Sequence, residues 1–185
     1  MPIDLLDEKS ALIVIDLQRG IVPLPEAAEA ERAVKQSVAL IEAFHAHKQP
    51  VVLVNVNGGA PGRTDAGGHL GELPADWAEF IDELPRQDDE IVVTKRTWGA
   101  FMHTDLHQQL QDRGITQVVV CGIATSIGAE STARQAYELG YNVVLCPDAM
   151  ADLDNDNHRH ACEKIFPRLG QVCSSADVIE LLEKK

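Results

Sequence analysis

The sequence predicts an α/β fold of three layers (αβα), a Rossmann-like arrangement in which helices cover both faces of a six-stranded parallel sheet. Apolar runs rich in β-branched residues alternate along the chain with segments of helical periodicity. Repeated strand-then-helix order implies parallel strands joined by right-handed crossovers. The 185 residues show no repeat, linker or break in composition. We therefore expect a single domain over residues 1–185.

The six expected strands are short apolar runs bounded by polar or turn-forming residues. The first shows no polar alternation, as expected of a central parallel strand that is covered on both faces. In chain order the strands are expected at residues 11–17, 51–56, 91–94, 117–121, 142–146 and 171–173.

Helical periodicity and capping residues locate the helices between these strands. The longest helix repeats apolar side chains at helical spacing and ends before Pro50. Asp76 is expected to cap a short helix that ends before Pro85. Gly114 and Gly140 suit the carboxyl ends of two further helices. The expected helices are 26–47, 76–84, 104–113, 129–139, 154–166 and 174–182.

A long irregular loop covers residues 57–74, which include six glycines and two prolines. A loop of this length in a compact domain usually covers a site or an interface. Arg63, within this loop, is a candidate contact for an anionic substrate.

Composition excludes several classes of partner. The formal net charge of −13 repels phosphates, so we expect neither nucleic acid nor a membrane surface as a partner. No apolar run approaches the ~18 residues needed to span a bilayer, and the first residues lack the features of a signal peptide. We therefore expect a cytoplasmic protein. Its four cysteines form no C-x-x-C pair and are expected to be reduced thiols, mostly buried.

Polar residues and a glycine-containing turn fall at the carboxyl ends of the expected strands. Asp16 ends the first strand, Lys95 ends the third, and residues 122–128 follow the fourth. In open parallel sheets, ligands bind beyond these ends, where the strand order reverses. The turn leads into a helix, so it points backbone N–H groups toward the same edge. This edge is the expected site.

The same residues resemble the signature of the isochorismatase-like hydrolases, G-[VI]-x-T-x-x-C followed by an alanine-rich helix with T-A-R. Here the stretch runs from Gly122 to Ala136, and Asp16 and Lys95 stand where the family ends its first and a middle strand with Asp and Lys. The similarity covers about residues 8–182. It implies the isochorismatase-like strand order 3-2-1-4-5-6, in which Lys95 reaches over the second strand. It also implies a small-molecule substrate and a homo-oligomer, dimeric or larger.

The resemblance assigns roles to residues at this edge. Asp16 is the expected general acid/base, and Lys95 is its electrostatic partner. The Ile123–Ala124 bond matches a non-proline cis peptide of the family, which turns the Ala124 N–H toward the substrate as part of an oxyanion site. Thr125 is expected to brace that turn.

Two further side chains are candidates for substrate binding. Gln18, two residues after Asp16, would add a second polar group to the site. Trp98 matches a region that lines the family's pocket, although a tryptophan is also typical of a core or an interface.

No metal or cofactor is expected. Nicotinamidases of the family hold zinc or iron through Asp-x-His at the end of strand two, where this chain has two amides in residues 55–57. A second acidic run, residues 152–157 with Glu163, resembles a calcium loop but lacks the required glycine. We interpret that run as a solvated turn that caps the next helix.

One departure from the family changes the expected chemistry, because Gly128 occupies the position of the nucleophilic cysteine. Attack by a thiolate is therefore closed, and neither Ser126 nor Ser131 has the spacing to replace it. The isochorismatase branch also carries Gly at this position. In that branch the Asp protonates a vinyl ether and water adds to the oxocarbenium ion. Isochorismatases carry Ala-His where this chain has Thr125-Ser126.

We therefore favour a hydrolase without a cysteine nucleophile, which cleaves a vinyl ether or a related C–O bond with Asp16 and Lys95. That mechanism requires a protonated Asp16, and burial must outweigh the Lys95 ammonium, which lowers the pKa. Two alternatives remain open. One is a catalytically silent ligand-binding or scaffold protein, and the other is an amidase of nicotinamidase type with water or serine as attacker.

Overall fold

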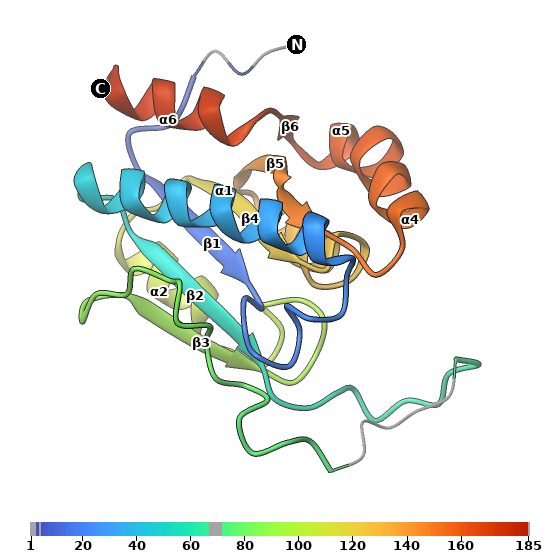
Figure 1. Cartoon of the computed structure of the whole chain (residues 1–185). Coiled ribbons are helices and arrows are strands. Elements are labelled where there is room, and N and C mark those ends of the chain that lie inside the picture. The colour runs from blue at the N-terminus through green and yellow to red at the C-terminus, as the bar shows by residue number, and fades with distance from the viewer. Residues whose placement is uncertain (1–2, 4, 67–71, 185) are drawn as a thin grey trace.

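The computed structural model describes residues 3, 5–66 and 72–184 (Figure 1). Its strands are β1 (Ser10–Ile15), β2 (Val51–Val56), β3 (Ile91–Lys95), β4 (Gln117–Ile123), β5 (Asn142–Ala151) and β6 (Gln171–Val172). They form one parallel sheet of order β3-β2-β1-β4-β5-β6. The α/β fold class and the strand order expected from the sequence are therefore confirmed.

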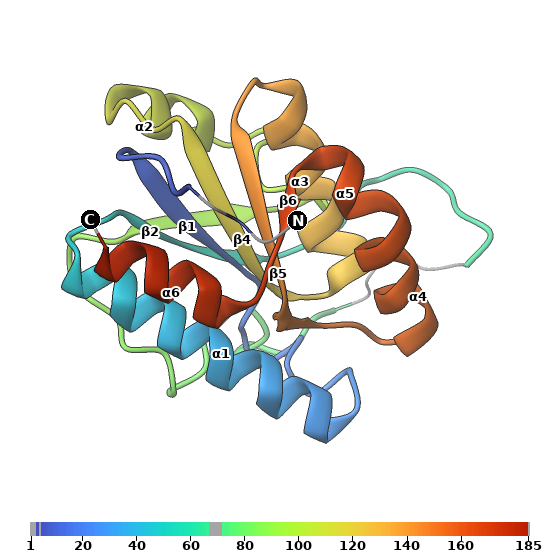
Figure 2. The ribbon, with the colours of Figure 1, turned by 90° about the horizontal axis from the view of Figure 1, so that it is seen from above.

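Helices and helical turns follow the strands. They are α1 (Ala27–Ala46), α2 (Leu106–Asp112), the π-helical turn η1 (Thr125–Ala129), α3 (Glu130–Glu138), α4 (Asn155–His160), the π-helical turn η2 (Ala161–Ile165), α5 (Phe166–Leu169) and α6 (Ser175–Glu183). α1 and α6 pack on one face of the sheet, and α2, α3 and α5 pack on the other (Figure 2). No helix in the described residues combines the length and the apolar composition needed to cross a membrane.

β1 and β4 form the centre of the sheet. Every residue of both strands is buried, because each strand has a neighbour on either side and helices on both faces. The connections after β1 and β4 lead to opposite halves of the sheet, so the strand order reverses between them. Their carboxyl ends therefore meet at the edge where such sheets bind ligands.

The prediction of a helix over residues 76–84 is wrong, because this segment forms turns instead. Its backbone pairs with the chain that follows β1. The Arg19 N–H donates to the Glu79 carbonyl oxygen (2.8 Å), and Phe80 forms an antiparallel bridge with Gln18. Contacts with a segment distant in the sequence thus override the local capping signal.

Two elements near the carboxyl terminus differ in extent from the expectation. β5 continues to Ala151, because it pairs again with β4 after a register shift between Val120 and Gly122. The helix expected over residues 154–166 begins as predicted, with Asp154 as its cap. It then divides into α4, η2 and α5.

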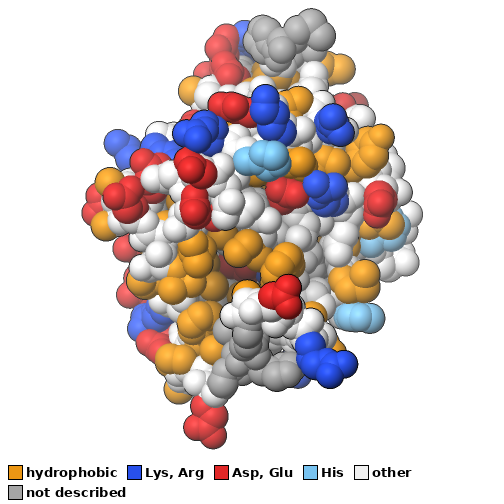
Figure 3. Space-filling view, turned by 90° about the vertical axis from the view of Figure 1, so that its right-hand side faces the viewer, with side chains coloured by type: hydrophobic (Ala, Val, Ile, Leu, Met, Phe, Trp, Pro, Cys, Tyr) orange, Lys and Arg blue, Asp and Glu red, His pale blue; other side chains and the backbone are white. Residues whose placement is uncertain are grey.

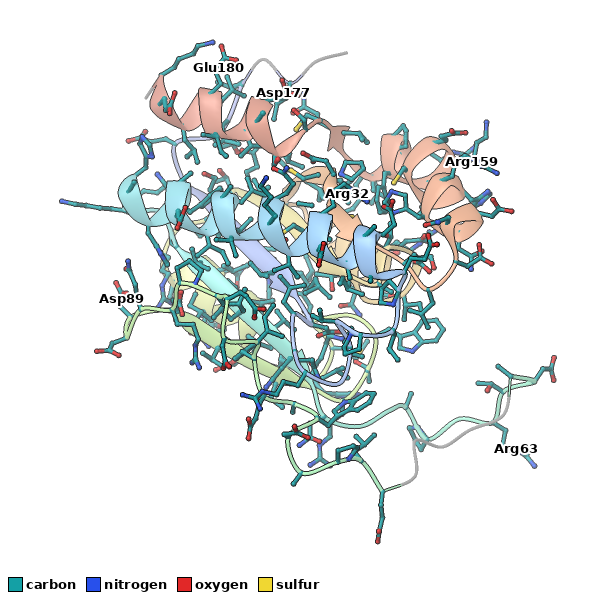
Figure 4. All side chains as sticks on the ribbon, viewed as in Figure 1. Arg32, Arg63, Asp89, Arg159, Asp177 and Glu180 are labelled. Atoms are coloured by element: carbon teal, nitrogen blue, oxygen red, sulfur yellow. The ribbon has the colours of Figure 1, made fainter. Side chains whose placement is uncertain are left out.

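The glycine-rich loop after β2 runs away from the sheet (Figure 1). Residues 59–66 are exposed, and residues 67–71 of the expected loop lie outside the described part of the chain. Arg63 lies in the outer part of this loop and points away from the body of the molecule (Figure 4). Its contact with an anionic substrate stays a prediction.

Candidate active site

A buried ion pair lies at the carboxyl edge of the sheet, between the ends of β1 and β3. Lys95, the last residue of β3, donates a hydrogen bond from Nζ to Oδ2 of Asp16 over 2.7 Å. Asp16 follows β1 with a φ of 52°, a left-handed conformation that Asp tolerates better than most residues. Only 4% of Asp16 and 2% of Lys95 is exposed. The structure thus brings the two residues together across β2.

Burial has the largest effect on the pKa of Asp16. It raises the pKa of Asp16 to about 6, and this effect outweighs the Lys95 charge and hydrogen bond, which both lower the pKa. Oδ1 of Asp16 receives no hydrogen bond from the described residues. The carboxyl group can therefore hold or release a proton near neutral pH, and one of its oxygens is unpaired.

Gly128, in η1, faces this carboxyl group. A Cβ atom at position 128 would lie 3.2 Å from Oδ2 of Asp16, 3.6 Å from the Trp98 carbonyl oxygen and 2.8 Å from Cγ2 of Ile15. A side chain at position 128 would thus point at the Asp16 carboxylate, but the Ile15 methyl group crowds it. Because Ile15 is fully buried and branched at Cβ, that methyl group cannot easily move away.

The turn between β4 and η1 forms the other side of the site. Gly122 (φ 112°) packs directly on the Ile15 backbone, where any Cβ atom would overlap. The next peptide bond, between Ile123 and Ala124, is cis. The Ala124 carbonyl oxygen accepts a hydrogen bond from the Ala129 N–H (3.1 Å), whereas the Ala124 N–H donates none to a described residue. The turn therefore keeps one backbone donor without a partner among the described residues.

Two side chains from beyond β5 hold this turn, and the sequence analysis missed both roles. His158 of α4 shares a hydrogen bond with the Thr125 hydroxyl (2.7 Å), and Asp152 accepts one from the Ser126 N–H (2.6 Å). Asp152 is buried, so its interpretation as part of a solvated turn is wrong. Nothing in the local pattern separates Asp152 from Asp154, because the contact of Asp152 with η1 joins residues that are 26 apart in the sequence.

The two expected binding side chains make different contacts. Gln18 is buried and joins neighbouring segments: Nε2 donates to the carbonyl oxygens of Val56 (3.0 Å) and Trp77 (2.8 Å), and Oε1 accepts from the Val56 N–H (2.7 Å). Trp98 keeps its backbone beside Gly128, but 62% of the residue is exposed. Gln18 thus braces the site, and substrate binding by either residue stays a prediction.

The segment that carries Trp98 is fixed to α3. Thr132 accepts a hydrogen bond from the Ala100 N–H (3.1 Å) and donates one to the Gly128 carbonyl oxygen (2.7 Å). Gln135 accepts one from the following backbone N–H (3.1 Å). Thr132 belongs to the Thr-Ala-Arg signature noted in the sequence, whereas no local signal marks Gln135 for this contact.

The face at the carboxyl ends of the strands is hollowed, and hydrophobic side chains surround the hollow (Figure 3). A cavity of about 630 Å³ lies beside α1, and neither Asp16 nor Lys95 lines it. That cavity and the ion pair are therefore separate features.

The described residues contain no group of three His, Cys, Asp or Glu side chains placed to hold a metal ion. Asn55, at the family's metal position, donates from Nδ2 to the Ala78 carbonyl oxygen (2.7 Å). Its amide thus ties β2 to the segment after the glycine-rich loop. A reaction without a metal stays a prediction.

Comparison with known proteins agrees with this geometry. The family model for the isochorismatase domain matches residues 10–177. The isochorismatase family protein YwoC of Bacillus subtilis is 44% identical over 94% of each chain, and YecD of Escherichia coli O157:H7 is 38% identical over 97% of this chain and 100% of that one. The structure of an isochorismatase family protein from Burkholderia thailandensis matches with a TM-score of 0.90 and 43% identity over 96% of this chain and 97% of that chain. The chain therefore belongs to the isochorismatase family of hydrolases.

Proposed function

We propose that this protein hydrolyses a small molecule by cleaving a vinyl ether or a related C–O bond, with Asp16 as general acid/base. One observation carries the proposal: burial holds the pKa of Asp16 at about 6 despite the adjacent Lys95, and Oδ1 is unpaired among the described residues. A general acid must keep its proton near the working pH, and an ordinary Asp, with a pKa near 4, does not.

The proposed reaction consumes one water and returns Asp16 to its starting state. Protonated Asp16 donates its proton to the terminal carbon of the vinyl ether, and the C=C electron pair forms the new C–H bond. Water adds to the resulting oxocarbenium carbon and loses a proton to the Asp16 carboxylate. The ether C–O bond of the hemiketal then breaks as the proton of its hydroxyl group passes to the leaving oxygen, which yields a carbonyl compound and an alcohol.

Lys95 and the Ala124 N–H stabilise charge at different points of this reaction. Once Asp16 has lost its proton, the Lys95 ammonium group 2.7 Å away stabilises the carboxylate. We assign the Ala124 N–H, which pairs with no described residue, to the ether oxygen of the substrate, which gains negative charge as the C–O bond of the hemiketal breaks. Both groups are held by the fold before substrate arrives, so little reorganisation accompanies the reaction.

Position 128 supports attack by water rather than by a protein nucleophile. Gly128 has no side chain, and Ile15 crowds the space that one would fill. An amidase of nicotinamidase type would need water or serine in place of the thiolate, so it ranks lowest. Metal independence, a cytoplasmic location and a homo-oligomer belong to the proposal as expectations: the first two come from the sequence, and the third comes from the family resemblance.

A catalytically silent ligand-binding or scaffold protein is the second candidate. The observation that favours it is the depth of Asp16, of which 4% is exposed, together with its separation from the cavity beside α1. A silent protein would bind small molecules without turnover, and the loss of Asp16 would not change a rate.

A substrate screen separates these functions. Vinyl ethers and small amides are offered to wild type, Asp16→Ala and Asp16→Asn, and product formation is followed by chromatography. We expect vinyl-ether turnover to fall by about a hundredfold or more in both variants, as is typical for loss of a general acid/base. Asp89→Asn removes an exposed carboxylate on a surface loop (Figure 4) and should leave the rate unchanged. Turnover that survives in Asp16→Ala would rule out the mechanism.

A further inference from the structure

The buried hydroxyl of Thr125 directly follows Ala124, whose N–H has no partner among the described residues. This hydroxyl has one hydrogen-bond partner within the described part of the chain. Thr125 is fully buried, and its Oγ1 shares a hydrogen bond with Nδ1 of His158 (2.7 Å). The other ring nitrogen, Nε2, lies 3.7 Å from Sγ of Cys162 on η2. Each nitrogen of the imidazole thus has one polar neighbour. Removal of the ring would leave a buried hydroxyl without a partner among the described residues, which is costly.

A second contact from the same region holds the next residue. Oδ2 of Asp152 accepts a hydrogen bond from the Ser126 N–H (2.6 Å), and Oδ1 accepts one from the Asp154 N–H (3.3 Å). Asp152 and His158 therefore anchor two successive residues, Thr125 and Ser126, that directly follow Ala124. Both anchors come from the segment after β5, on the far side of the turn from β1.

Charged groups around His158 shift its pKa in both directions, and burial has the largest effect on that pKa. Burial lowers the pKa of His158, and the Arg32 guanidinium of α1 lowers it further, whereas Asp152 and Glu29 raise it. Arg32 lies between α1 and the end of β5 (Figure 4), where it donates to the Met150 carbonyl oxygen (3.0 Å). A neutral imidazole has one donor and one acceptor nitrogen, so it suits two different polar neighbours.

We propose that His158 is a positioning residue, which holds the Ala124 N–H in place through the Thr125 hydroxyl. The inference rests on the proposed function, because it gives the turn its catalytic role. The hydrogen-bond partners of His158 are Thr125 and Cys162, and it forms no hydrogen bond with Asp16 or Lys95. It fixes the backbone that carries the donor, and Asp152 fixes the following residue.

Conservative variants separate positioning from packing. The amide of Asn reaches the place of Nδ1, and the amide of Gln reaches that of Nε2. His158→Ala should lower kcat by about tenfold, as expected for one hydrogen bond, with little change in KM. His158→Asn should restore most of the rate and His158→Gln should not. A role in packing alone predicts that Gln, the larger side chain, rescues at least as well as Asn. His160→Ala, an exposed position on the same helix, is the matched control and should retain the full rate.

A readout without substrate keeps this test independent of the proposed reaction. Amide hydrogen exchange of the peptide over residues 122–128 is measured in wild type, His158→Ala, His158→Asn and Asp16→Asn. Exchange should speed up about tenfold in His158→Ala alone. If Asp16→Asn keeps its turnover, the proposed function fails, while the exchange result still decides whether His158 holds the turn.

Thr125→Val keeps the shape of the side chain and removes the hydroxyl, so it serves if His158→Ala does not fold. The exchange rate and kcat of Thr125→Val should match those of His158→Ala. The double variant Thr125→Val/His158→Asn should recover neither value, because the hydroxyl that Asn would bind is absent. Wild-type exchange in both single variants would overturn the proposal. Fast exchange with an unchanged kcat would overturn the positioning role, and so would equal rescue by Gln and Asn.

Discussion

Asp16 and Arg19 lie close together in the sequence, yet their ion pairs have different surroundings. Asp16 pairs with Lys95 at 2.7 Å, and both side chains are almost completely buried. The Arg19 side chain is 44% exposed, and its guanidinium lies 3.2–3.9 Å from three exposed carboxylates, those of Asp76, Glu79 and Asp82.

Access to water explains why the two regions differ. Around Arg19, solvent screens the charges, and exposed pairs of this kind typically contribute about 0–1 kcal/mol each. Around Asp16, solvent is excluded, so burial raises the pKa and either partner alone would be an uncompensated charge. The loss of one partner should therefore destabilise the fold far more at the buried pair than at the surface cluster.

The largest expected effect comes from breaking the buried pair. Lys95→Met removes the ammonium group and leaves the Asp16 carboxylate buried without its partner. We expect the free energy of unfolding at pH 8 to fall by about 3–5 kcal/mol, measured by urea denaturation. The loss should be smaller at pH 5, where Asp16 can hold a proton. Arg96→Met, at the exposed next position, is the control. A loss below about 1 kcal/mol at pH 8 would contradict the burial of the pair.

The raised pKa of Asp16 predicts a specific dependence of stability on pH. Its pKa in the folded chain is about 6, against an ordinary value of 3.8 for a solvated aspartate, so the folded state binds the proton more tightly. This contribution to stability is complete below about pH 4 and is lost as the pH rises through 6. Between pH 4 and pH 7, wild type should therefore lose about 2 kcal/mol relative to Asp16→Asn. Equal slopes of unfolding free energy against pH in the two proteins would refute the raised pKa.

The same protonation should appear in the kinetics of the proposed reaction. If protonated Asp16 is the general acid, kcat/KM for a vinyl ether falls above pH 6 by about tenfold per pH unit. A pH–rate profile of wild type tests this. A rate that is level from pH 5 to pH 8 would assign the proton transfer to another group.

A methyl group at position 128 probes how tightly the buried pair is packed. Gly128→Ala would place Cβ 2.8 Å from Cγ2 of Ile15 and 3.2 Å from Oδ2 of Asp16. We expect a loss of about 1–3 kcal/mol from overpacking, measured by urea denaturation. Gly62→Ala is the matched control, since a Cβ there meets no atom within 4 Å. Equal stability of the two variants would show that the Ile15 side chain can move to make room for a Cβ atom. Gly128→Cys would then be a feasible way to introduce a thiol nucleophile.

The smallest expected effect comes from the exposed cluster. Arg19→Ala removes all three surface ion pairs. We expect the free energy of unfolding to fall by less than about 1 kcal/mol in low salt and by less still in about 0.5 M NaCl. A loss of unfolding free energy as large as that in Lys95→Met would mean that exposure to solvent does not explain the difference between the two regions.

The sequence determined the fold class and placed the candidate site at the carboxyl ends of the strands, because both follow from local pattern. Apolar runs with few polar interruptions mark buried strands, and their carboxyl ends locate Asp16, Lys95 and the turn after Gly122. The family resemblance supplied the strand order, which the structure confirms. That Gly128 stands in the place of the family's nucleophile stays a prediction from the signature.

Tertiary packing alone decided how those residues behave. Asp16 and Lys95 are 79 residues apart, and Thr125 and His158 are 33 apart, so local periodicity carries no information about either contact. The same holds for residues 76–84, which pair with the chain after β1 instead of forming a helix. The pKa of Asp16, the crowding of Gly128 by Ile15 and the burial of Asp152 depend on which distant segments exclude water from each group. Desolvation depends on the assembled fold, so it cannot be predicted from a short stretch of the sequence.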